Sequence, residues 1–259
     1  MKQTKELATL PNERALTELK ASFPVEQGFT RSFLPRLSMV SQDRTEGKGK
    51  SMKVVAEAGT FFEERQDEEE NGEGKKEWIK KELGSKVKGI ILYQRKQLRL
   101  YDEKTEMYTS SPIYDEENQV IPLFCNKAEV ARGTPADLKA LYQYEKDGKT
   151  KSKLEDNRVL YVLKDDEIFQ LSLRGSSMYS WMTFAKKVLP PSVLVELSSE
   201  PMEKGQISWN KMTFEVVRPL NADEVKDVML RVVEIKDGIA QERAYYASAN
   251  KAKDELEKF

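Results

Sequence analysis

The chain has 259 residues, enough for one large domain or two smaller ones, and 43 Lys and Arg residues against 44 Asp and Glu residues give it a net charge of −1. A nucleic-acid site would therefore have to be a local basic groove, because the protein as a whole is no polycation. Histidine is absent and Cys125 is the single cysteine, which excludes the commonest general base, the commonest metal ligand and an intrachain disulfide.

The N-terminal residues 1–29 are expected to form an arm. Leucines in the first 22 residues suit a short amphipathic helix, but Pro11 interrupts the pattern, and a mobile arm is the alternative. This end of the chain has no apolar segment of the kind found in secretory signals. No apolar run approaches the roughly 18 residues of a membrane span. We therefore expect no membrane association and a cytoplasmic location, the host cytoplasm in the case of a viral protein.

Residues 30–218 are expected to form a β core. Alternating or continuous apolar residues predict strands at 87–101, 159–163, 168–173, 193–197 and 207–217. Two short helices are expected within this core. Thr134 and Pro135 begin the first, which should reach about Tyr144, and the second runs from Ser176 or Ser177 to Val188, before Pro190. Trp181 and Phe184, on the second helix, are interpreted as core residues.

Two segments of this core, before the strand expected at 87–101, are more polar. Residues 63–77 contain no apolar side chain and predict a charged loop or insertion. Residues 77–83 have a short helical pattern that Gly84 would end.

Residues 219–259 are expected to form a C-terminal helix with an acidic tail. Asn221 can cap the helix and Glu224 follows three residues later, as in a capping box. The predicted fold class is therefore mainly β (α+β), with an antiparallel core, inserted short helices and a C-terminal helical arm.

The sequence does not favour an enzyme. Cys125 lies in the apolar stretch 121–125, has no histidine to activate it, and is interpreted as a buried, inert thiol. The acidic residues crowd into predicted loops, whereas a carboxylate–metal nuclease needs them on rigid strands. We expect no catalytic residue, no metal and no cofactor.

Aromatic and basic residues alternate in three segments, as a single-stranded nucleic-acid site requires, because rings stack on bases and cations bind phosphates. If residues 93–101 are extended, Tyr93, Arg95, Arg99 and Tyr101 share one face. The other two segments are 174–181 and 209–211. The candidate ligands are Tyr93, Arg95, Lys96, Arg99, Tyr101, Tyr108, Arg174, Trp209 and Lys211. The alternative is that the tyrosines are half-buried and pack on a face of the sheet, and that Arg95 and Lys96 are merely surface residues at the tip of a hairpin.

The end of the chain is a candidate partner-binding segment, since an acidic stretch closed by an aromatic residue can bind a basic pocket. The residues concerned are Asp254, Glu255, Glu257 and Phe259.

In layout the sequence resembles bacteriophage single-stranded-DNA-binding proteins with an OB-fold. The resemblance rests on segments 33–37, 108–114 and 169–177 and on the acidic end with Phe259. It implies an OB-like barrel with insertions, coating of single-stranded DNA during replication or recombination, contacts with replication or recombination proteins through the tail, and no catalytic residue.

Two other functions stay open. A structural or assembly protein without nucleic acid would use the same charged surface and C-terminal helix, and a carboxylate–metal nuclease is the weaker alternative. The oligomeric state is also open, a homo-oligomer included.

Overall fold

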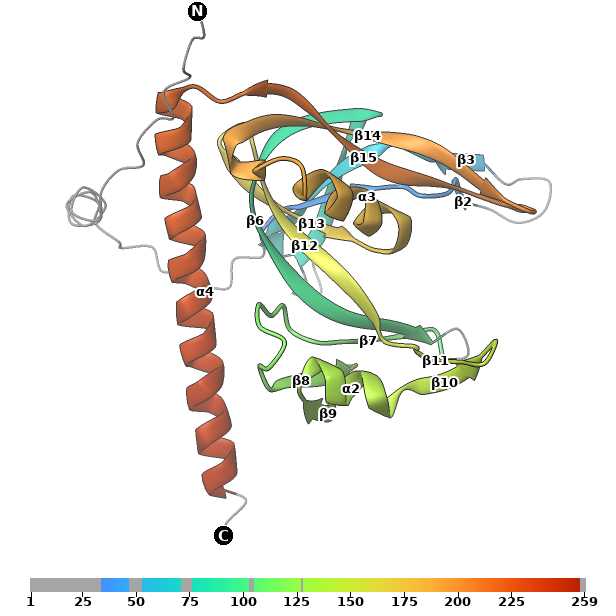
Figure 1. The fold of residues 1–259 in the computed structure, drawn as a ribbon, viewed down its shortest axis with the longest axis vertical. Coiled ribbons are helices and arrows are strands. Elements are labelled where there is room, and N and C mark those ends of the chain that lie inside the picture. Colours follow the sequence, from blue (N-terminus) through green and yellow to red (C-terminus); the bar gives the residue numbers. More distant parts are fainter. Residues whose placement is uncertain (1–33, 47–52, 71–75, 103–104, 127, 257–259) are drawn as a thin grey trace, which may run out of the picture. The chain divides into compact units, whose positions relative to one another are not determined.

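The computed structural model describes residues 34–46, 53–70, 76–102, 105–126 and 128–256 (Figure 1). The chain divides into two compact units, one of which is Leu34–Pro219. The other contains the C-terminal residues from Leu220 onward. The predicted arm, residues 1–29, lies outside the described residues. No described helix is both long enough and apolar enough to cross a membrane.

Eleven described strands of the larger unit form one mixed sheet. Nine follow each other in space as β5 (Lys76–Gly84), β4 (Phe61–Glu70), β1 (Arg36–Met39), β13 (Glu167–Leu173), β12 (Glu155–Lys164), β6 (Lys86–Asp102), β7 (Met107–Ser110), β8 (Ile121–Cys125) and β9 (Ala128–Gly133). The other two are β14 (Val193–Lys204), which pairs with β6, and its neighbour β15 (Ile207–Pro219). The expected mainly β core is confirmed. The sheet is open, with β5 and β9 at its ends, and does not close into a barrel.

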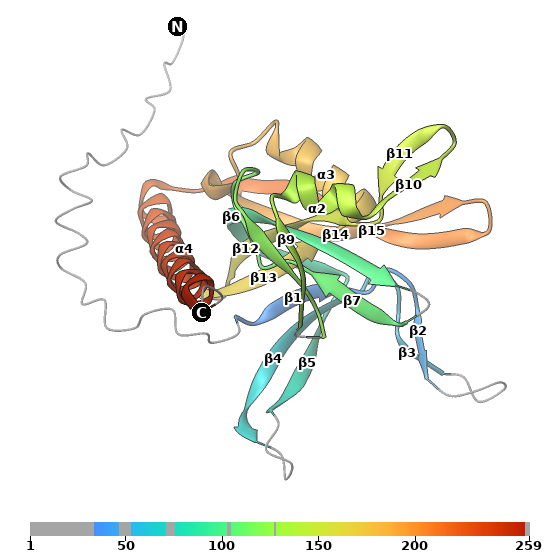
Figure 2. The same ribbon diagram turned by 90° about the horizontal axis from the view of Figure 1, so that it is seen from below.

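The expectation of a purely antiparallel core is wrong at one pair, because β1 runs parallel to β13. Two small hairpins stand apart from the sheet, β2 (Arg44–Glu46) with β3 (Lys53–Ala56) and β10 (Gln143–Lys146) with β11 (Lys149–Ser152). Figure 2 shows the β4–β5 and β14–β15 hairpins extending well beyond the centre of the sheet.

The long strand β6 connects the parts of the sheet, because its successive segments pair with β14, β12 and β7. Its register with β12 shifts at one point, where Tyr93 faces Tyr161 but Ile91 faces Val162, so Leu92 is an extra, bulged residue. Gly89 is required nearby. A Cβ at this position would lie 2.7 Å from the Val162 side chain and 2.9 Å from the Leu163 carbonyl oxygen.

Two clusters of buried apolar side chains hold the larger unit together. The first includes Leu37, Ile91, Leu160, Phe169 and Trp181. Helix α3 (Gly175–Ala185) covers this cluster, and the ring of Trp181 lies 5.3 Å from that of Phe214 on β15. The prediction of Trp181 as a core residue is thereby confirmed. The second cluster includes Leu138 of helix α2 (Pro135–Leu141) and consists of Leu98, Tyr114, Ile121, Leu123, Leu138 and Leu154.

A tight turn joins β12 to β13. Asp165 and Asp166 have φ values of 49° and 63°, which suit the two central residues of the tight hairpin turn between β12 and β13. A short 3₁₀ helix, η2 (Pro190–Ser192), separates α3 from β14.

Residues 61–84 differ from the prediction. The expected charged loop at 63–77 is largely β4 and β5, and the expected helix at 77–83 is part of strand β5. The reason is charge pairing, since the Lys80 ammonium lies 3.2 Å from the Glu64 carboxylate on the opposite strand. Cross-strand pairs of opposite charge stabilise a hairpin that has few apolar residues.

The C-terminal unit contains helix α4 (Ala222–Leu256), and it begins with the predicted capping box. The Asn221 side-chain oxygen accepts hydrogen bonds from the backbone N–H groups of Asp223 and Glu224, both at 3.0 Å. The Glu224 carboxylate in turn accepts one from the Asn221 N–H at 2.8 Å. One stripe of the helix is buried and consists of Val228, Val232, Ile235 and Ile239.

Candidate functional site

The predicted shared face of β6 is confirmed by the strand register. Tyr93, Arg95 and Arg99 lie opposite Tyr161, Val159 and Glu155 of β12, so their side chains alternate regularly through this stretch. Tyr101 continues the same face and lies opposite Tyr108 of β7. The face differs greatly in exposure along its length, however, and this decides which residues can contact a ligand.

Arg95 is not an accessible cation. Its side chain is only 2% exposed, its Nε lies 3.1 Å from the Asp115 carboxylate, and its guanidinium donates a hydrogen bond to the Ile113 carbonyl oxygen at 2.9 Å. The segment between β7 and β8 thus covers it. Arg95 is a structural residue in this conformation, and it is not part of the surface that a ligand can contact.

Three further predicted ligands are also engaged with other side chains. Lys96 forms an ion pair with Glu117, and Lys211 forms one with Glu200 at 3.0 Å. Tyr93 is half-buried, with its ring centroid 6.5 Å from that of Tyr161. These residues contribute less to an open cationic surface than the sequence alone predicts.

Arg99, Tyr101 and Tyr108 form an accessible cluster. The two tyrosines are 45% and 50% exposed, and their ring centroids are 4.7 Å apart. The Arg99 guanidinium lies 5.0 Å from the centroid of the Tyr108 ring, a distance typical of a cation–π contact. The cluster therefore presents flat, exposed rings with a cation beside them.

Arg99 also lies in the field of two more arginines. Burial lowers the pKa of the Arg99 guanidinium, the positive charges of Arg174 and Arg36 lower it further, and Tyr108 acts in the opposite direction. An arginine remains protonated at neutral pH in such an environment. Within the described part of the chain, Arg99 and Arg174 have no carboxylate at ion-pair distance. The result is a local concentration of positive charge.

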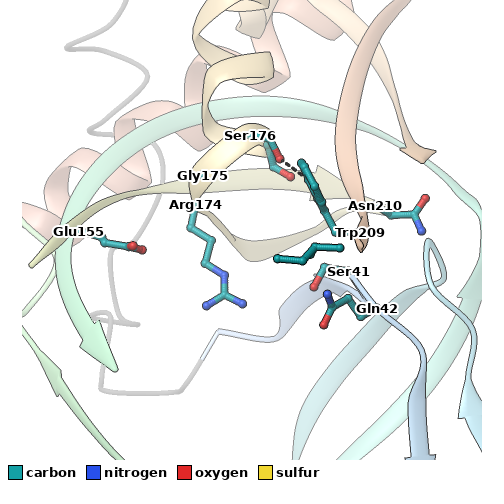
Figure 3. Close-up of a pocket in the computed structure, with 10 residues that line it drawn as sticks. Ser41, Gln42, Glu155, Arg174, Gly175, Ser176, Trp209 and Asn210 are labelled. Atoms are coloured by element: carbon teal, nitrogen blue, oxygen red, sulfur yellow. Dashed lines mark hydrogen bonds between the residues drawn. The ribbon is translucent and has the colours of Figure 1, made fainter. Parts of the chain in front are cut away.

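A cavity of about 470 Å³ adjoins this group (Figure 3). Its walls come from distant parts of the chain: the segment after β1, the start of β12, the junction of β13 with α3, and the first half of β15. The lining residues are Ser41, Gln42, Glu155, Arg174, Gly175, Ser176, Ser177, Ile207, Trp209 and Asn210. Arg174 and Trp209 were both predicted as ligands, and the fold brings them to the same cavity.

Long-range hydrogen bonds fix these walls. The Trp209 indole N–H donates to the Ser176 hydroxyl at 3.1 Å, and the Met212 N–H donates to the Ser177 hydroxyl at 2.9 Å. The Asn210 N–H donates to the Ser41 carbonyl oxygen at 2.7 Å. Strand β15 is thus held against both α3 and the segment after β1, so the cavity is largely preformed.

Glu155 is the acidic residue of this cavity. In Figure 3, Arg174 lies between Glu155 on one side and Trp209 on the other. The Glu155 carboxylate opposes the binding of an anion at its end of the cavity.

The sequence did not indicate Arg36, Ser41, Gln42 or Glu155 as site residues. Ser41, Gln42 and Glu155 lie in short polar stretches without an aromatic neighbour, and Arg36 is a single cation between Pro35 and Leu37. Only the pairing of β1 with β13 brings residues 36–42 to this surface. Of the tail residues, Asp254 and Glu255 belong to the end of α4, whereas Glu257 and Phe259 lie outside the described residues. In the described part of the chain, no group of three or more Asp, Glu or Cys residues could hold a metal ion.

No family model matches the chain, and neither a curated protein nor a solved structure is significantly similar to it.

Proposed function

We propose that this protein binds single-stranded DNA and coats it during DNA replication or recombination. The observation that carries the proposal is the grouping of Arg99, Arg174 and Arg36 beside the exposed rings of Tyr101 and Tyr108. Like charges crowded together raise the free energy of the unliganded protein, and phosphates relieve that repulsion.

Single strands suit this surface better than duplexes, because their bases are free to stack on exposed rings. Tyr101 and Tyr108 supply such rings, and Trp209 supplies a third in the adjoining cavity. The family resemblance implies a closed barrel, but the proposed function does not need one. A single strand of DNA can bind along one exposed face of an open sheet.

The proposal extends to the cellular context. A location in the cytoplasm, or in the host cytoplasm for a bacteriophage protein, follows from it. Binding of replication or recombination proteins to the C-terminal residues Asp254, Glu255, Glu257 and Phe259 is part of the same proposal.

The test is a fluorescence titration with oligo(dT), following tryptophan emission. Quenching is expected from Trp209, which is partly accessible, and not from the buried Trp181. Its loss in Trp209→Phe separates it from any signal of the third tryptophan, Trp78. The double variant Arg99→Ala/Arg174→Ala is expected to lose at least about 100-fold in affinity, since each charged contact is worth about 1.5–3 kcal/mol and two are removed.

The matched control is Lys186→Ala/Lys187→Ala. It removes two exposed positive charges at the other end of α3, about 18 Å from Arg174 by the rise of the helix. It should bind like the unaltered protein. Equal losses in both double variants would mean that only net charge matters, and no binding at all, with self-association through α4, would favour the assembly alternative.

A further inference from the structure

The cavity beside Arg174 has features that phosphate binding alone does not require. Its volume of about 470 Å³ lies within the range of small-molecule sites. Trp209 and Ile207 both line it and, two residues apart on β15, share one face of that strand, which gives the cavity an apolar wall. Figure 3 shows Arg174 across from Trp209. A phosphate needs cations and N–H donors, so an apolar, aromatic wall indicates a flat and largely apolar group.

The aromatic wall is held in a fixed orientation. The hydrogen bond from the Trp209 indole to the Ser176 hydroxyl sets the angle of the ring, and the bond between Asn210 and Ser41 sets the position of the strand beneath it. A ring that is already immobilised loses little conformational entropy when a ligand stacks on it.

Gln42 supplies a hydrogen-bond acceptor at the edge of the cavity. Its Nε2 donates to the Ser208 carbonyl oxygen at 3.0 Å, and a carbonyl can only accept, so this bond fixes the orientation of the amide. The Oε1 atom then remains to accept a hydrogen bond from a ligand. Every nucleobase carries at least one N–H or amino donor on its pairing edge.

We propose that this cavity receives one unstacked base of the bound strand, between Trp209 and Ile207 on one side and the Arg174 guanidinium on the other, with the Gln42 Oε1 atom at its edge. The inference rests on the proposed function, and it assigns the cavity a different role from the Arg99–Tyr101–Tyr108 cluster. The face of a guanidinium and an indole ring both stack on bases, and the N–H edge of Arg174 stays available for a phosphate of the same strand. Because a paired base cannot enter, the site selects single strands over duplexes.

The experiment is an abasic scan. The shortest oligo(dT) that binds is first determined, and each base in turn is then replaced by an abasic unit, which leaves every phosphate in place. One position is expected to lose about 5- to 150-fold in affinity, the range for one stacked base. A flat scan, with intact binding that still depends on Arg99 and Arg174, would overturn the inference but leave the proposed function standing.

Variants of the cavity wall test whether the base identified by the abasic scan binds in this cavity. In Ile207→Ala and Trp209→Ala, the penalty for the abasic unit should shrink, because the wall that recognises the base is lost. Ile207 is 62% exposed, so its variant should fold normally even if Trp209→Ala does not. Tyr179→Ala is the control, since this aromatic residue of α3 is 68% exposed and does not line the cavity; it should retain the full penalty.

A free nucleotide would use the same base chemistry. Thymidine monophosphate should compete only weakly, because it lacks the neighbouring phosphates that the arginines bind. Competition by the mononucleotide at concentrations near the oligonucleotide's own dissociation constant would overturn the assignment to a strand, and it would show instead a site for free nucleotides.

Discussion

Arg95 and Arg99 are four residues apart on strand β6 and therefore share one face of it, yet their surroundings differ. Arg95 is buried against Asp115, whereas Arg99 is partly accessible and lies over the ring of Tyr108. The difference comes from what covers each residue, since the segment containing Ile113 and Asp115 reaches Arg95 but not Arg99. The first arginine stabilises the fold, and the second is available to a ligand.

Replacing Arg95 by alanine is therefore expected to destabilise the protein by about 3 kcal/mol, because it removes the buried cation that pairs with the mostly buried Asp115 carboxylate. Urea denaturation measures this change. The neighbouring variant Lys96→Ala is the control and should cost less than about 1 kcal/mol, since Glu117 is exposed. Folded Arg95→Ala should still bind oligo(dT) normally, and a stable variant with weakened binding would restore Arg95 as a ligand.

The same comparison shows what can be predicted at the residue scale. Strict alternation predicts correctly that residues 93–101 share a face, because it depends only on local backbone geometry. Accessibility is not local. No pattern within 93–101 indicates that Asp115, about 20 residues away in the chain, covers Arg95, or that Arg174 approaches Arg99.

The hydroxyl of Tyr114 is buried without a hydrogen-bond partner among the described residues. Tyr114→Phe removes a group that loses its hydration on folding, so stability at pH 7 should be unchanged or higher by up to about 1 kcal/mol. Tyr179→Phe, at an exposed position, is the control. A loss of more than about 1 kcal/mol in urea denaturation would mean that the hydroxyl has a partner, such as an internal water.

The pH dependence of this variant has a definite sign. Burial raises the pKa of Tyr114 above its ordinary value of 10.0, and the charges of Glu117 and Asp156 raise it further. The unfolded chain therefore releases this proton first, and stability is lost as pH rises above about 10. The unaltered protein should lose roughly 1 kcal/mol more than Tyr114→Phe between pH 9 and pH 11.

At the scale of elements, the cavity depends on how α3 is joined to β15. Ser176 and Ser177, in the first turn of the helix, accept hydrogen bonds from the Trp209 side chain and the Met212 backbone. Two adjacent residues of one helix therefore hold strand β15 at two points three residues apart, and they keep Trp209 at the cavity that Arg174 also lines.

Ser177→Ala should consequently affect both stability and binding. It leaves the N–H of the buried Met212 without an acceptor, which costs about 1–3 kcal/mol, and it loosens β15, which should weaken oligo(dT) binding a few-fold. Thermal unfolding and the fluorescence titration measure the two effects. Ser180→Ala, one turn later on α3, is the control. Normal binding by a destabilised Ser177→Ala would show that the cavity does not depend on this junction.

Elements with local signals are predicted well, and those stabilised by pairing are not. The capping boxes at Thr134–Asp137 and Asn221–Glu224 need only residues three apart, so the starts of α2 and α4 follow from the sequence. The β4–β5 hairpin has a composition typical of a solvated loop. Its strands form because ion pairs such as Lys80–Glu64 lie across from one another, and this register is not visible in either strand alone.

At the scale of the whole molecule, near-neutrality and a basic site are compatible because charges are paired unevenly. Cations of several strands are neutralised by nearby carboxylates, as in Lys86–Glu196 and Lys211–Glu200. Arg99 and Arg174 have no such partner among the described residues. The balance of 43 basic and 44 acidic residues therefore limits long-range attraction to DNA but not local affinity.

The salt dependence of binding measures this local charge directly. For single strands, the slope of log K against log salt is about −0.7 for each phosphate neutralised. If Arg99 and Arg174 each bind one phosphate, the double alanine variant should reduce the magnitude of the slope by about 1.4. Lys186→Ala/Lys187→Ala should leave the slope unchanged, because those exposed lysines lie at the far end of α3. An identical slope for the arginine variant and the unaltered protein would mean that phosphates bind elsewhere, because each phosphate contact that is lost reduces the number of counterions released on binding.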